Sequence, residues 1–142
     1  FHDVGTMARI IKFEALQPNL FSIKVKGEER FKIRSANKGR YSLWNGVVSK
    51  IDYDAIVPIP DNLSRLQRQL EILLDVNDNN SFFGSDKLSN LKQRLEESGW
   101  VANRLAELLP ISFLQKQKLL EENDPLLRLN KINTVLQQIE GL

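Results

Sequence analysis

The spacing of apolar residues changes once along this chain of 142 residues, at Pro58-Ile59-Pro60. Before this point apolar and polar residues alternate, which is the period of a β-strand. After it, apolar residues recur at three- and four-residue steps, which is the period of an amphipathic helix. The prolines favour a stiff, extended connector. We therefore predict an α+β protein, with a β subdomain over residues 1–57 and a helical subdomain over residues 58–142.

The front part is predicted to form an antiparallel sheet. Alternation is cleanest on both sides of Gly27-Glu28-Glu29, a short link that predicts a hairpin turn. Pro18-Asn19 marks another turn. The expected strands are Val4–Phe13, Leu20–Lys26, Glu29–Ser35 and Tyr41–Ile51.

The back part is predicted to form four or five helices, separated by residues that stop or start a helix. Pro110 ends one segment, because it lacks an N–H group. Ser112 lies three residues before Gln115, which is the spacing of a capping box. Asp124 is a good N-cap for the last helix, since Pro125 can occupy the first helical position. Trp100 is expected to be buried between these helices.

The composition limits the partners and the cellular compartment that can be expected for this chain. The net charge of +2 is too small to indicate nucleic acid by itself, and there is no cysteine for a disulfide or a thiolate metal site. No apolar run approaches the length of a membrane span, so no membrane partner is expected. A chain without cysteine suits a reducing compartment, and we expect the cytoplasm. Because the sequence begins at Phe1, we expect a processed product or a fragment.

Several short motifs, in this order and spacing, resemble the N-terminal domain of Lon proteases and the small stand-alone bacterial proteins made only of that domain. The similarity covers essentially the whole chain. The motifs are Gly5-Thr6-Met7-Ala8-Arg9-Ile10, Gly27 with Arg30-Phe31, Trp100-Val101 leading to Leu108-Leu109-Pro110, Lys116-Gln117 with Leu119-Leu120, and Arg128-Leu129.

This resemblance implies a partial β-barrel related to the PUA fold, followed by a helical bundle. It also implies a role in recognising protein substrates for ATP-dependent degradation. The family's Phe-Pro-Leu opening and its Phe-Glu-Pro-Arg-Tyr stretch do not occur here. The chain is therefore expected to enter the family's fold midway through its sheet. The incomplete sheet is expected either to associate with a second copy through the β region or to be completed by a segment outside this sequence.

The residue types that carry out common reactions are missing. The sequence has no phosphate-binding loop of the form G-x-x-x-x-G-K-[ST], and nothing resembles the family's Ser-Lys protease domain. His2 is the only histidine, which argues against a catalytic triad or a metal site. We therefore expect no enzymatic activity, no catalytic residue, no metal and no cofactor.

The expected function is the binding of unfolded or misfolded polypeptide through exposed apolar segments. Aromatic residues and one arginine near the predicted strands and in the Asn-rich loop are the candidate contacts. They are Phe21, Phe31, Arg40, Tyr41, Trp44, Phe82 and Phe83.

RNA binding by a PUA-like module is the alternative, because the strand region is both basic and aromatic. Such a face can hold phosphates and stack bases. Lysines that alternate along a strand also simply keep its outer face and edge in water, so nucleic acid is the less favoured partner. The residues concerned are Lys24, Lys26, Lys32, Arg34, Lys38, Arg40, Tyr41 and Trp44.

Overall fold

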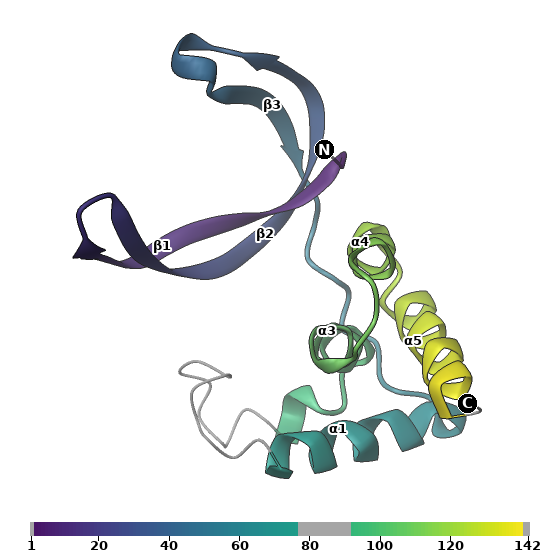
Figure 1. The fold of residues 1–142 in the computed structure, drawn as a ribbon. Helices are drawn as coiled ribbons and strands as arrows, with labels where there is room; N and C mark the ends of the chain where they lie inside the picture. Colours follow the sequence, from purple (N-terminus) through teal and green to yellow (C-terminus); the bar gives the residue numbers. More distant parts are fainter. Residues whose placement is uncertain (1, 77–91, 141–142) are drawn as a thin grey trace. The chain divides into compact units, whose positions relative to one another are not determined.

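The computed structural model describes residues 2–76 and 92–140 (Figure 1). The chain divides into two compact units, residues 1–53 and residues 54–142, which we call the β unit and the helical unit. The first contains an antiparallel sheet and the second contains helices, so the predicted α+β class is confirmed. The division falls slightly before the predicted boundary at residue 57.

The β unit is built from three antiparallel strands in the order β1-β2-β3. They are β1 (Val4–Gln17), β2 (Leu20–Lys38) and β3 (Trp44–Lys50), and the 3₁₀ turn η1 (Arg40–Ser42) joins the last two. The β1–β2 turn is the predicted Pro18-Asn19 turn. Asn19 has a φ of 64° there, a left-handed conformation that asparagine tolerates better than most residues.

The predicted hairpin at Gly27-Glu28-Glu29 is wrong, because β2 runs through this link without turning. Gly27 pairs with Ala8, and the register shifts between Thr6 and Ala8, where β2 carries an extra residue. The link is therefore a β-bulge in a continuous strand. A glycine with polar neighbours indicates that regular strand pairing is interrupted. Either a turn or a bulge can cause such an interruption.

The helical unit contains η2 (Asp61–Leu63), α1 (Ser64–Val76), α3 (Ser98–Leu108), α4 (Phe113–Glu121) and α5 (Pro125–Glu140). The predicted capping box is confirmed: the Gln115 backbone N–H donates to Ser112 Oγ at 3.2 Å, and the Ser112 N–H donates to Gln115 Oε1 at 2.9 Å. Asp124 Oδ1 accepts from the Leu126 N–H at 2.8 Å, which caps α5 as predicted.

The core of the helical unit consists of apolar side chains from all of its helices. Trp100 is buried as predicted, with 9% of its surface exposed. Helix α3 contacts α1, α4 and α5, so it lies at the centre of this unit. The buried apolar residues are Leu63, Leu66, Leu70, Leu95, Trp100, Val101, Ala102, Leu105, Leu109, Leu119, Leu129, Ile132 and Leu136.

The proline connector is extended, as predicted, and it is also held by the start of α3. Pro58 forms a short antiparallel bridge with Glu97. The Ser98 N–H donates to the Val57 carbonyl at 2.8 Å, and the Ser98 hydroxyl donates to the Pro58 carbonyl at 2.9 Å. Ser98 is fully buried, so these bonds fix the connector firmly against the start of α3.

The described residues contain neither a membrane-spanning helix nor a cluster of metal ligands. None of the described helices has the length and apolar character needed to cross a membrane. No group of His, Cys, Asp and Glu side chains in residues 2–76 and 92–140 is arranged to hold a metal ion.

Candidate functional site

The pairing of β1 with β2 places large apolar side chains on one side of the sheet. Ile10 lies opposite Val25, and Phe13 lies opposite Ile23. Directly opposed residues of an antiparallel pair point to the same side. We define the apolar face as the six residues of these pairs and of the next pair on that side: Ile10, Phe13, Ala15, Phe21, Ile23 and Val25.

The apolar face is exposed. Phe13 and Phe21 stack on each other with ring centroids 5.1 Å apart, yet 55% of Phe21 remains exposed. The other large side chains of the face are exposed to a similar extent. A contiguous apolar patch of this kind typically marks a site of interaction.

The other side of the same two strands carries cations. Arg9 lies opposite Lys26, and Lys12 lies opposite Lys24. We call these four residues the cationic face. Arg9 pairs with Glu28, and Lys12 Nζ lies 2.7 Å from the Glu14 carboxylate. The β1–β2 ribbon is therefore amphipathic, with an apolar face and a cationic face.

Phe31, a predicted contact, has a structural role. It pairs with Gly5 across the sheet, and a Cβ added to Gly5 would lie only 2.7 Å from the end of the Phe31 ring. The Phe31 ring therefore lies over Gly5. It covers the Gly5 backbone, which has no side chain of its own to cover it. Phe31 is half-buried, and it belongs to the sheet more than to an open surface.

Arg40, Tyr41 and Trp44 lie together at the η1 turn. Tyr41 is 93% exposed and has a φ of 58°, a strained value for a residue with a large side chain. Lys38 Nζ lies 5.8 Å from the centroid of the Trp44 ring, which is within the range of a cation–π contact. This turn presents an aromatic and basic tip to solvent.

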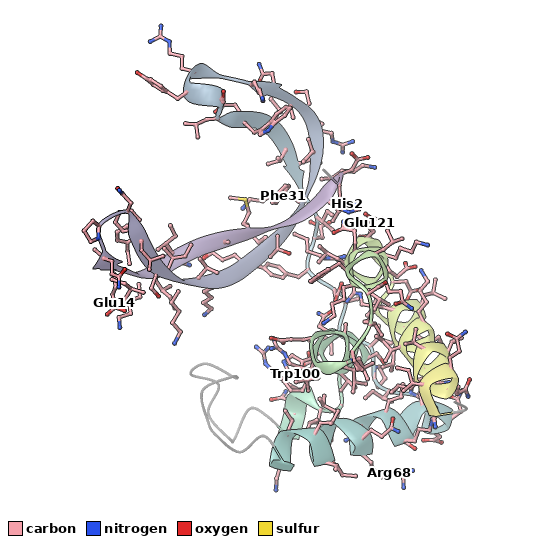
Figure 2. All side chains as sticks on the ribbon, in the orientation of Figure 1. His2, Glu14, Phe31, Arg68, Trp100 and Glu121 are labelled. Atoms are coloured by element: carbon pink, nitrogen blue, oxygen red, sulfur yellow. The ribbon has the colours of Figure 1, made fainter. Side chains whose placement is uncertain are left out.

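The predicted contacts thus fall into separate groups. Phe21 lies near the β1–β2 turn and Arg40, Tyr41 and Trp44 lie at the η1 turn, and these turns are at opposite ends of β2 (Figure 1). Figure 2 shows Phe31 between them.

Phe82 and Phe83 lie outside the described residues. Ile10 and Phe13 were not among the predicted contacts, because the side to which β1 residues point depends on the bulge between Ile10 and Lys12.

One ion pair joins β2 to the end of β3. Lys50 Nζ lies 2.8 Å from Glu29 Oε2. The hydrogen bond to Lys50 lowers the pKa of Glu29, and the same bond raises the pKa of Lys50. Each shift moves the pKa further from neutrality, so both groups stay charged at neutral pH.

Comparison with known proteins places this geometry in a family. Residues 1–138 match the family described as the ATP-dependent protease La (LON) substrate-binding domain. Among solved structures, a Lon N-terminal domain protein from Xanthomonas campestris is similar, with a TM-score of 0.75 and 27% identity over 94% of this chain and 68% of that chain.

A second similar structure is the N-terminal domain of Lon protease from Mycobacterium avium complex. Its TM-score is 0.60 and its identity is 18%, over 92% of this chain and 67% of that chain. At that identity the match supports the fold alone. A search of curated proteins found no match. Since the family match spans nearly all of the sequence, this chain belongs to the family of Lon substrate-binding domains.

Proposed function

We propose that this chain is a non-catalytic module that binds unfolded polypeptide, or exposed apolar segments of misfolded proteins, through the β unit. The observation that carries the proposal is the apolar face of β1 and β2. Large side chains such as Phe13, Phe21 and Ile23 are held side by side in solvent by regular strand pairing. Membership of a substrate-binding family supports a polypeptide as the ligand.

Burial of apolar surface provides the affinity in this proposal. Full burial of a Phe, Ile or Val side chain contributes roughly 1.5–3 kcal/mol, and these side chains begin about half exposed. Several such contributions are enough for micromolar binding after the cost of association. Because the effect is not directional, it gives little sequence preference, which suits the capture of unfolded chains.

The module is proposed to bind polypeptide without catalysing a reaction. The sequence has no phosphate-binding loop, and the described residues contain no metal-binding group. The purified chain is therefore expected neither to hydrolyse ATP nor to cleave casein. The sequence has no cysteine and therefore no disulfide, which suits a reducing compartment. We therefore propose the cytoplasm as the compartment.

Binding is tested by fluorescence anisotropy with a labelled, permanently unfolded protein and its folded parent. The chain should bind the unfolded form and not the folded form, with little dependence on salt. The double variant Phe13→Ser/Phe21→Ser should lose at least tenfold in affinity. Phe113→Ser is the matched control, because Phe113 is 92% exposed on the helical unit and should not contribute.

Equal loss from both variants, or binding that survives the double variant, would contradict the assignment to the apolar face. A Tyr41→Ser variant asks whether the η1 tip contributes instead. Tight binding of single-stranded RNA that weakens steeply with salt, without binding of unfolded protein, would favour the nucleic-acid alternative.

A further inference from the structure

Part of one edge of strand β2 is not paired with another strand among the described residues. β1 pairs with β2 from Leu20 to Lys32, and β3 pairs on the other side only from Phe31 to Lys38. A bond from the Ile51 N–H to the Arg30 carbonyl extends that side slightly. On the β3 side, the segment Leu20–Glu29 therefore has no strand neighbour among the described residues.

This open edge is more regular than the outer edge of β1. β1 carries extra residues between Ile10 and Lys12 and between Ala15 and Gln17, and such bulges disrupt pairing with a further strand. Leu20–Lys26 of β2 has no extra residue of its own and no proline. An incoming strand would therefore pair here, in line with β3, more readily than along β1.

The side chains of this segment define the strand that would suit it. Phe21, Ile23 and Val25 belong to the apolar face, and Lys24 and Lys26 belong to the cationic face. Alternate side chains of an added strand would continue the same two faces. The apolar face would be extended by apolar residues, and the cationic face by residues of complementary charge.

The cationic face is built with like charges directly opposed, which destabilises a sheet. Arg9 faces Lys26 and Lys12 faces Lys24, while the two nearby carboxylates pair with the β1 cations. An acidic strand next to β2 would relieve this repulsion. A second copy of β2 would add further lysines to the same face, so self-pairing at this edge is disfavoured.

We infer that the β2 edge Leu20–Lys26 binds an extended polypeptide whose side chains alternate between apolar and acidic. This inference rests on the proposed function and adds to it a binding mode and a substrate class. Main-chain hydrogen bonds hold the added strand, and the side-chain pattern sets the preference. Segments of alternating apolar and basic residues are rejected by the lysines.

The test compares short labelled peptides on the 142-residue chain by anisotropy at low salt. Val-Glu-Val-Glu-Val-Glu-Val should bind about tenfold or more tightly than Val-Lys-Val-Lys-Val-Lys-Val, since several cross-strand charge pairs change sign. A peptide of the same composition with the glutamates in one block should bind weakly. N-methylation of all the internal amides of the first peptide should abolish binding, because it removes the main-chain donors on both edges of the peptide and leaves the side chains in place.

Charge reversal provides the second arm. Lys24→Glu/Lys26→Glu should invert the preference toward the lysine peptide, whereas Lys118→Glu, at an exposed position of α4, should leave it unchanged. Binding of unfolded protein without any preference between the peptides, or binding that survives N-methylation, would overturn the inference and leave the proposed function standing. Failure to bind unfolded protein and every peptide would overturn both.

Discussion

The guanidinium of Arg128 joins Asp54, the first residue of the helical unit, to α3 and to the end of α4. Only 2% of Arg128 is exposed, and its Nη1 lies 2.5 Å from Asp54 Oδ2 and 3.1 Å from Asn103 Oδ1. It also donates to the carbonyls of Leu119 and Glu122, which end α4. One buried cation thus satisfies a carboxylate and the carbonyls at a helix C-terminus.

Replacing Arg128 with leucine is expected to destabilise the chain by about 3–5 kcal/mol, because Asp54 loses its buried partner. The measurement is the urea midpoint of helical circular dichroism. Arg68→Leu is the matched control, since Arg68 is exposed on α1 (Figure 2). If both variants unfold at the midpoint of the original chain, the Arg128 network contributes nothing to stability.

Glu122 gives stability a defined pH dependence. Lys131 Nζ lies 2.5 Å from its carboxylate, and this bond, with the Asp124 N–H, lowers the pKa of Glu122 below its ordinary 4.5. The stabilisation is fully present above pH 4.5 and is lost as the pH falls through the lower folded pKa. The difference in urea midpoint between the original chain and Glu122→Gln should therefore vanish in acid and be largest near neutrality. A constant difference at all pH values would contradict this.

At the scale of elements, α3 is the central helix of its unit. Gly99 in its first turn is a close-approach site, because an added Cβ would lie 3.0 Å from Asp54 Oδ2 and 3.1 Å from Pro125 Cβ. The next residue, Trp100, fills the core. The glycine thus lets Asp54 and the start of α5 pack against α3.

Truncation of Trp100 to alanine should cost about 3–5 kcal/mol, the usual loss for a buried aromatic side chain. Trp44→Ala is the matched control, because Trp44 is exposed at the start of β3. Thermal unfolding followed by helical circular dichroism measures both. A Trp100→Ala variant as stable as Trp44→Ala would show that α3 does not carry the core.

The elements differ in how well their sequence predicts them. The capping box at Ser112 and the Asp124 cap are local patterns, and both are present as predicted. The link at Gly27 was wrongly predicted because a bulge and a turn use similar residues, and only the partner strand distinguishes them. For the same reason Phe21 was found by alternation along β2, whereas Phe13 became part of the site only through the register of β1.

At the scale of the whole molecule, the two units differ in burial. Every buried residue among those described lies in the helical unit. Sheets of few strands with an uncovered apolar face are marginally stable by themselves. The β unit is therefore expected to be the less stable of the two, which is typical of a region that adapts to a ligand.

Unfolding is accordingly expected to occur in two transitions. In urea, the fluorescence of a Trp100→Phe variant reports Trp44 in the β unit, and that of a Trp44→Phe variant reports Trp100 in the helical unit. The Trp44 signal should change at the lower urea concentration. Coincident transitions would show that the units unfold as one cooperative body.

Residue-resolved hydrogen exchange, with and without a saturating unfolded polypeptide, tests the binding site most directly. Amides of β2 from Leu20 to Lys26 should gain protection on binding, because an added strand and a covered apolar face both slow exchange there. Amides of α3 should exchange at unchanged rates. Protection confined to the helical unit or to the η1 turn, while anisotropy shows that the polypeptide is bound, would contradict binding at the apolar face and at the edge of β2.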